Sequence, residues 1–350
     1  MSSLDSHRRY SVLPGRAGRC AVRFLLAVLL ALGGVLLPPW TAAPTAVAAP
    51  RPIHVGSGPV GIALTPDGHH AYVTNSGSFS VSVIDTRTNK VVGRIRTGHT
   101  PFGVAVTPDG RRAYVTNALS DSVSVIDTTA NEVVDDVFLK ADSSPIDVAI
   151  TPDGRRAYVT NAGSDSVSVI DTTDNKVIGS PLRVGSTPIG VAITPDGRRA
   201  YVTNGGFGSP VPVSVIDTST GKVAGLPVRI GSFPYAVAVT PDGQRVYVTD
   251  QSGTVAVIDT RTDTVAGDPI PVAFKPNDVA VTRDGHRVYV THSGAESVSV
   301  IDTSTGKATG TPIPVGGTSD GIAVTADGRR AYLTHSCCGA VSVIDLEPSR

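Results

Sequence analysis

The chain has 350 residues, and its 30 basic and 30 acidic side chains give a formal net charge of zero. No block of lysine or arginine follows the first fifty residues, which excludes the charge pattern of a nucleic-acid or anionic-lipid binder. Glycine (37) and proline (26) are abundant but stand at regular intervals beside Val-Ile-Tyr runs, a pattern typical of turns between short strands rather than of disorder.

Residues 1–48 have the features of a secretory signal peptide. Five arginines precede an apolar run at residues 24–37, and the small residues 46–48 form a cleavage site. The apolar run is shorter than the roughly 20 residues that a membrane span needs, although an uncleaved anchor is the alternative. We therefore expect a secreted or cell-surface protein that has no stable membrane insertion after cleavage.

One motif returns through the rest of the chain at an almost fixed period. It combines a Pro-Asp-Gly turn with a β-branched and aromatic run, as in residues 151–161. The tyrosines that mark it follow one another at intervals of 42 to 46 residues: Tyr72, Tyr114, Tyr158, Tyr201, Tyr247, Tyr289 and Tyr332. Such a period indicates a repeat architecture.

Each repeat is predicted to form four short antiparallel strands. In the second repeat the strands cover residues 101–107, 113–117, 123–127 and 133–139, and no stretch has helical periodicity. We call these strands A to D. A single four-stranded meander with apolar residues on both faces cannot bury them, but units packed around an axis can. The sequence therefore predicts an all-β protein, a seven-bladed β-propeller.

The two ends of the propeller are predicted to meet in one blade. The last repeat stops after residues 341–345 and lacks strand D, whereas residues 51–55 resemble the ends of the other D strands. We expect residues 51–55 to pair beside residues 341–345, which would close the ring and remove exposed strand edges. Residues 49–350 would then form a single propeller domain, expected to be a monomer.

The run Thr-Pro-Asp-Gly-x-x-Ala-Tyr-Val-Thr-Asn, followed by Ser-Val-Ile-Asp-Thr, resembles the YVTN-type β-propeller repeat of secreted and surface-layer proteins. The resemblance covers the whole chain after the leader and implies the propeller fold. It leaves the activity open, because related propellers include surface antigens and adhesion modules, and more distant ones include lactonases and redox enzymes. No cofactor is expected.

The carboxylates that recur in every repeat are interpreted as structural. Asp in each Asp-Gly turn caps its own backbone, and the adjacent glycine accepts a positive φ. A catalytic pair needs two different environments that separate the pKa values of its members, and seven equivalent copies do not supply them.

Candidate binding residues are those at which the repeats differ. In a propeller the B–C and D–A loops share one face, where the central channel opens. The divergent candidates on this face are Phe102, Tyr235, Asn277, Lys275, His99 and the carboxylates Asp147, Asp278 and Asp320. The alternative is a solvated rim whose residues vary without a function. Residues 205–212 form an insertion on the same face, and Phe207 is a candidate aromatic anchor there.

Two histidines and two cysteines raise the question of a metal site. His292 and His335 occupy the position after Tyr-Val/Leu-Thr in neighbouring repeats, and Cys337 and Cys338 follow. Equivalent atoms of adjacent blades should lie roughly 10 Å apart, too far for ligands of one zinc ion, so no metal site is predicted. The adjacent cysteines of an exported protein are instead candidates for a vicinal disulfide, with free thiols as the alternative.

These features favour a secreted, non-enzymatic binding protein that presents its B–C and D–A loops to a protein or a polysaccharide. The alternative is a lactonase- or lyase-type enzyme with its site at the channel mouth and Asp147, Asp278, Asp320 and His99 as candidate residues. No catalytic motif of a known type decides between them.

Overall fold

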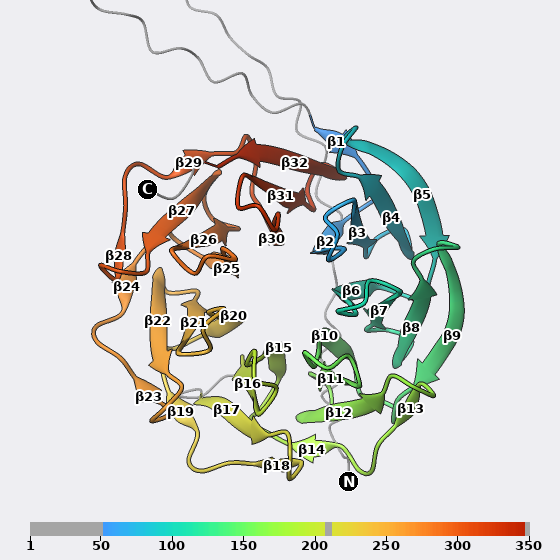
Figure 1. The fold of residues 1–350 in the computed structure, drawn as a ribbon, viewed down its shortest axis with the longest axis horizontal. Coiled ribbons are helices and arrows are strands. Elements are labelled where there is room, and N and C mark those ends of the chain that lie inside the picture. The colour runs from blue at the N-terminus through green and yellow to red at the C-terminus, as the bar shows by residue number, and fades with distance from the viewer. Residues whose placement is uncertain (1–51, 207–211, 347–350) are drawn as a thin grey trace, which may run out of the picture. The chain divides into compact units, whose positions relative to one another are not determined.

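The computed structural model describes residues 52–206 and 212–346, and within them the chain is all-β. Seven antiparallel sheets are arranged around a central axis as the blades of a propeller (Figure 1). The described residues contain no helix that is long and apolar enough to cross a membrane. The leader predicted for residues 1–48 and the candidate Phe207 lie outside the described residues.

Each blade follows the predicted order from the axis outward. The innermost A strands are β2 (Pro59–Leu64), β6 (Pro101–Val106), β10 (Pro145–Ile150), β15 (Pro188–Ile193), β20 (Pro234–Val239), β25 (Pro276–Val281) and β30 (Ile322–Val324). The B strands are β3 (His70–Asn75), β7 (Arg112–Asn117), β11 (Arg156–Asn161), β16 (Arg199–Asn204), β21 (Arg245–Asp250), β26 (Arg287–His292) and β31 (Arg330–His335). The C strands are β4 (Ser80–Asp85), β8 (Ser122–Asp127), β12 (Ser166–Asp171), β17 (Pro212–Asp217), β22 (Thr254–Asp259), β27 (Ser297–Asp302) and β32 (Ala340–Asp345).

The outermost strand is continuous in only two blades, which refines the prediction of one D strand per blade. It is unbroken in β5 (Lys90–Arg96) and β9 (Glu132–Phe138). In the next four blades it is split into two short strands: β13 (Lys176–Val177) and β14 (Leu182–Arg183), β18 (Lys222–Val223) and β19 (Val228–Arg229), β23 (Thr264–Val265) and β24 (Ile270–Pro271), β28 (Lys307–Ala308) and β29 (Ile313–Pro314).

The sequence explains the interruption. Each split strand carries a Gly-x-Pro step, as at Gly179 and Pro181, and its glycine has a positive φ, 63° at Gly179. Proline cannot donate to the ladder, and a positive φ turns the backbone out of it. The first two blades lack this proline and keep their ladders.

The predicted closure of the ring is confirmed. Strand β1 (Ile53–His54) pairs with β32, with Ile53 opposite Val341 and His54 opposite Ala340. In Figure 1 the blue β1 accordingly lies at the edge of the dark red sheet of β30, β31 and β32. The first strand of the propeller therefore completes its last blade.

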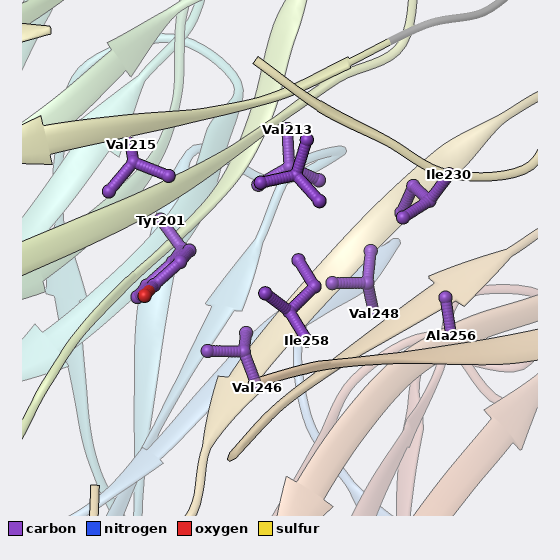
Figure 2. Close-up of a cluster of buried hydrophobic side chains, with 9 residues drawn as sticks. Tyr201, Val213, Val215, Ile230, Val246, Val248, Ala256 and Ile258 are labelled. Atoms are coloured by element: carbon purple, nitrogen blue, oxygen red, sulfur yellow. The ribbon is translucent and has the colours of Figure 1, made fainter. Parts of the chain in front are cut away.

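The hydrophobic core is divided into seven clusters, one between each pair of neighbouring blades. In Figure 2, Tyr201, Val213 and Val215 of one blade pack against Val246 and Ile258 of the next. The cluster at the seam joins Tyr332 and Val341 to Ala71, Val73 and Ile84 of the first blade. Because every blade is covered on both sides, its strands are apolar on both faces, as the sequence predicted.

The repeated tyrosine also links the blades through its hydroxyl group. Tyr72 donates to Asn131 Oδ1 in the C–D turn of the next blade at 2.7 Å, and Tyr332 reaches Asn89 across the seam at 2.8 Å. Arginines at the start of the B strands add contacts on the same face; Arg330 donates to the Thr86 carbonyl oxygen at 2.9 Å. The face of the A–B and C–D turns is thus held by bonds that repeat from blade to blade.

Candidate functional site

A cavity of about 100 Å³ opens at the mouth of the central channel. Every blade contributes two consecutive residues to its wall: Val60 and Gly61, Phe102 and Gly103, Ile146 and Asp147, Ile189 and Gly190, Tyr235 and Ala236, Asn277 and Asp278, Asp320 and Gly321. These positions were expected in the D–A loops. In six of the seven blades they lie within the A strand itself, at a β-bulge near its start.

A threonine of each B strand fixes this bulge and joins it to the next blade. The Gly61 N–H donates to Thr74 Oγ1 at 2.8 Å, and the Thr74 hydroxyl donates to the Phe102 carbonyl oxygen of the second blade at 2.6 Å. The equivalent hydroxyl-to-carbonyl bond occurs at all seven interfaces and is 2.6 to 3.4 Å long. The threonine of the Tyr-Val-Thr-Asn motif is therefore an inter-blade link, a role that the sequence analysis did not assign.

The innermost strands approach one another so closely that some positions require glycine. A Cβ atom added at Gly61 would lie 2.4 Å from the Phe102 carbonyl oxygen, and one at Gly321 would lie 2.4 Å from the Val60 carbonyl oxygen. Both distances are well inside van der Waals contact, so a larger residue would push the blades apart.

Two of the predicted carboxylates also form hydrogen bonds between neighbouring blades, as the threonines do. Asp147 accepts the N–H of Val148 at 2.8 Å and the N–H of Val191, in the next blade, at 3.0 Å. Asp278 accepts the N–H of Val279 at 2.8 Å and that of Ile322 at 2.9 Å. Each carboxylate thus uses one oxygen within its blade and the other across the interface.

These two carboxylates have raised pKa values. Burial raises the pKa of Asp147 to about 7, with the negative charge of Asp278 adding to the rise and the two N–H donors opposing it. Burial likewise raises the pKa of Asp278 to about 6. Tyr235 lines the same cavity, and its pKa rises to about 12 through burial and through the charges of Asp320, Asp278 and Asp147. Burial therefore disfavours the charged forms of Asp147 and Asp278, and the backbone N–H donors favour them.

Asp320 and Asn277 line the cavity but are engaged differently. Asn277 is buried, and its side-chain amide donates to the Asp320 carbonyl oxygen at 3.1 Å. The Asp320 carboxylate accepts the N–H of Ser336 at 2.8 Å, in the B–C loop of the last blade. It therefore braces that loop, whereas Asp147 and Asp278 hold the innermost strands.

His99 does not belong to this cavity. Its side chain is exposed and its ring stacks on Phe79, with the ring centres 4.8 Å apart. The grouping of His99 with the channel carboxylates was therefore wrong. The D–A loop that carries it lies beside the B–C loop of the preceding blade, which carries Phe79.

His292 and His335 are buried at the position where four of the other B strands have asparagine and β21 has Asp250. The Nε2 atom of His292 lies 2.8 Å from Ser299 Oγ, and that of His335 lies 2.8 Å from Ser342 Oγ. Asn75 contacts the equivalent Ser82 at 3.1 Å. Within residues 52–206 and 212–346 no set of three or more His, Cys, Asp or Glu side chains could hold a metal ion.

The two cysteines lie side by side in the exposed B–C loop of the last blade. They are free thiols in this structure, with their Sγ atoms 2.7 Å apart. The next residue, Gly339, accepts the N–H of Val55 at 2.9 Å, so this loop touches the strand that closes the ring.

Four exposed apolar side chains on the B–C and D–A loops were missed in the sequence analysis: Phe79, Leu119, Phe233 and Phe274. Leu119 is 75% exposed, and its N–H donates to the His99 carbonyl oxygen, so it lies next to the Phe79–His99 stack. The signal was present, because at these loop positions most other repeats have small or polar residues. No large hydrophobic side chain is exposed in the described A–B and C–D turns.

Comparisons with known proteins agree with the fold. A family model described as a YNCE-like beta-propeller matches residues 19–155 and 52–199, together more than half of the chain. Among solved structures, hydrazine synthase of Kuenenia stuttgartiensis is similar with a TM-score of 0.75 and 24% identity, over 88% of this chain and 99% of that chain.

Virginiamycin B lyase from Staphylococcus aureus is similar with a TM-score of 0.72 and 17% identity, over 85% of this chain and 99% of that chain. None of the curated proteins matches the chain. At these identities the structural likeness shows a shared fold, and an activity has to be argued from the site itself.

Proposed function

This chain belongs to the YNCE-like β-propeller family, and we propose that it is a secreted, non-enzymatic binding protein. Its partner, a protein or a polysaccharide, binds to the face formed by the B–C and D–A loops. The observation that carries the proposal is the placement of exposed apolar side chains. Of the eleven large apolar side chains that are exposed in the described residues, four lie on the loops of this face and seven on or between the outermost strands, whereas the turns of the opposite face repeat the same polar Asp-Gly sequence.

The strongest candidate contact is a patch over the first two blades, formed by Phe79, His99 and Leu119. Phe79 is 43% exposed and held by its stack on His99, and Leu119 lies beside them. An aromatic ring already fixed in position loses little conformational freedom on binding and suits both a sugar ring and an apolar protein side chain.

Binding is tested on arrays of defined glycans and of extracellular proteins. A Phe79→Ser, Leu119→Ser double variant should lose binding at least tenfold with little change in melting temperature, because both side chains are exposed. The matched control is Arg111→Ser, Arg155→Ser on the opposite face, which should bind as the unchanged protein does. Equal binding by the loop-face variant, or loss confined to the control, would show that the wrong face was assigned.

Secretion is part of the same proposal and is supported by the basic and apolar leader of residues 1–48. Expression in a bacterium with a general export pathway should release a protein that begins at Ala49. Amino-terminal sequencing would contradict the leader assignment if the exported chain still began at Met1.

A second candidate function is a lyase- or lactonase-type enzyme, favoured by the pKa values of Asp147 and Asp278. A carboxylate that titrates at about 7 is suited to proton transfer at neutral pH. The two backbone donors on each carboxylate favour the structural role instead. Turnover of a lactone panel that falls at least 100-fold in Asp147→Asn would favour the enzyme.

A further inference from the structure

Each A strand directs toward the channel the backbone N–H of the residue that follows its second cavity-lining residue. In the first blade, Thr65 donates to the His70 carbonyl oxygen, which makes Ala63 and Tyr72 the next hydrogen-bonded pair. Ile62 and Val73 are then a non-hydrogen-bonded pair, so the Ile62 N–H points away from the B strand. The same register places the N–H of Val104 toward the channel.

Four of these seven N–H groups are already capped by carboxylates of the chain. Asp147 accepts from Val148 and Val191, and Asp278 accepts from Val279 and Ile322. In each case one carboxylate spans the N–H groups of two neighbouring blades. The channel therefore contains a repeated two-donor site for a carboxylate, and the protein itself occupies it twice.

A third copy of this site has no carboxylate of its own. Ile62 and Val104 belong to neighbouring blades, and the residue equivalent to Asp147 is Gly61. Within the described parts of the chain, no side chain accepts a hydrogen bond from either N–H group. The seventh N–H group is that of Val237. The equivalent N–H groups of both neighbouring blades, those of Val191 and Val279, are already capped, so Val237 forms no uncapped pair.

The chain cannot fill this third copy with a residue at position 61. The Cβ atom of such a residue would lie 2.4 Å from the Phe102 carbonyl oxygen. An acceptor therefore has to enter from the channel, where Gly61, Phe102 and Gly103 line the cavity. The cavity volume of about 100 Å³ is well above the roughly 10–15 Å³ that is needed to hold one water, so a small group can enter.

We propose that the N–H groups of Ile62 and Val104 bind the carboxylate group of a ligand at the channel mouth. The two oxygens are held as those of Asp147 and Asp278 are held, one by each blade, and the rest of the ligand extends toward the loop face. Binding strengthens as the pH falls below about 7, because Asp147 then loses its charge. The inference deepens the proposed function, since it names a group of the partner, such as a uronic acid or an acidic side chain.

The test uses acetate as the probe and the ¹⁵N-labelled protein at pH 6. The amide protons of Ile62 and Val104 should shift downfield along a saturable curve with a Kd in the millimolar range, as expected for one small ligand. The amide protons of Val148 and Val191 are the internal control, because Asp147 already caps them. Acetamide, which has the same shape without the charge, should shift the first pair much less.

An engineered copy of the site provides the second measurement. Asp278→Gly should uncap Val279 and Ile322, so that acetate shifts these two amides as well and raises the melting temperature of the variant. Shifts at Ile62 and Val104 that do not saturate, or that equal those of Val148 and Val191, would overturn the proposal. That result would leave the array experiment on Phe79 and Leu119 unaffected, so the two failures are distinguishable.

Discussion

At the scale of single residues, each position of the Tyr-Val-Thr-Asn motif has its own structural role. The tyrosine hydroxyl bonds to the C–D turn of the next blade, and the threonine hydroxyl bonds to the next A strand. The asparagine ties the B–C and D–A loops to its B strand: the Asn75 amide donates to Ser80 and Ser82, and its oxygen accepts the N–H of Gly56. The threonine bond is made at all seven interfaces between blades, so the motif recurs for structural reasons and carries no information about the ligand.

Two tyrosines of the motif should respond differently to loss of the hydroxyl group. Tyr201 donates to Asp263 Oδ1 at 2.6 Å, whereas the buried Tyr247 hydroxyl has no carboxylate partner among the described residues. Tyr201→Phe should cost ~2 kcal/mol, as expected for a bond to a charged group, and Tyr247→Phe under ~0.5 kcal/mol. Urea denaturation of both variants measures the difference, and equal losses would contradict it.

The channel carboxylates should make stability depend on pH. Their folded-state pKa values, about 7 for Asp147 and about 6 for Asp278, lie above the value of about 4 for an unfolded chain. The folded state then binds more protons than the unfolded state between these values. The stability that they contribute is therefore full below about pH 4 and is lost as the pH rises through about 7.

The melting temperature should accordingly fall between pH 5 and pH 8. In Asp147→Asn, Asp278→Asn this fall should be much smaller, even though the amides cap fewer N–H groups and lower the stability at every pH. Asp67→Asn is the control: hydrogen bonds from Thr65 and His69 lower the pKa of Asp67, so its titration lies below this range. A double variant that keeps the full slope would show that other groups titrate.

At the scale of elements, the closing strand β1 is short but well buried. Ile53 is 7% exposed and Val55 is 8% exposed, and both pack in the cluster between the last and the first blade. Arg94 of the first blade also donates to the Val55 carbonyl oxygen at 3.1 Å. Residues 53–55 thus contact both the last and the first blade at the seam.

Ile53→Ala should lower the stability by ~2–4 kcal/mol, because it leaves a cavity in that cluster. His54→Ala is the matched control, since His54 is exposed and should change stability by no more than ~0.5 kcal/mol. Thermal denaturation of both single variants measures the contrast. If the two melt alike, the strand contributes little to closure.

The loop that contacts β1 contains the two cysteines that we predict to form a vicinal disulfide. In exported protein, Cys337 and Cys338 should be bridged, and the intact mass should be two hydrogens lower than after reduction. Two thiols that alkylate without reduction would rule out the bridge. Because the bridge closes no long loop, Cys337→Ser, Cys338→Ser should leave the melting temperature almost unchanged.

At the scale of the whole molecule, the seven interfaces form a closed chain of similar contacts. Thr334 in the last blade donates to the Val60 carbonyl oxygen in the first, as Thr74 does to Phe102. Only the bonds to the Asn277 and Asp320 carbonyl oxygens exceed 3 Å. The innermost part of the ring is therefore regular, and the blades differ in their outermost strands, side chains and loops.

The sequence alone determined the number of blades, the order of their strands and the closure by the first strand. These features follow from sequence patterns that recur in each repeat, namely the Asp-Gly turn and the order of the short strands, and from the absence of strand D in the last repeat. It also identified most of the channel wall, including Asp147, Tyr235, Asn277 and Asp278, because these positions differ among equivalent repeats.

Only the tertiary structure decided what those residues contact. The capping of Val191 by Asp147 joins two blades across 44 residues of chain, and the place of His99 depends on its stack on Phe79 in the preceding blade. A repeat pattern shows which positions are equivalent, but not how closely two blades approach. The packing around the axis sets that distance, and with it which backbone N–H groups remain for a ligand.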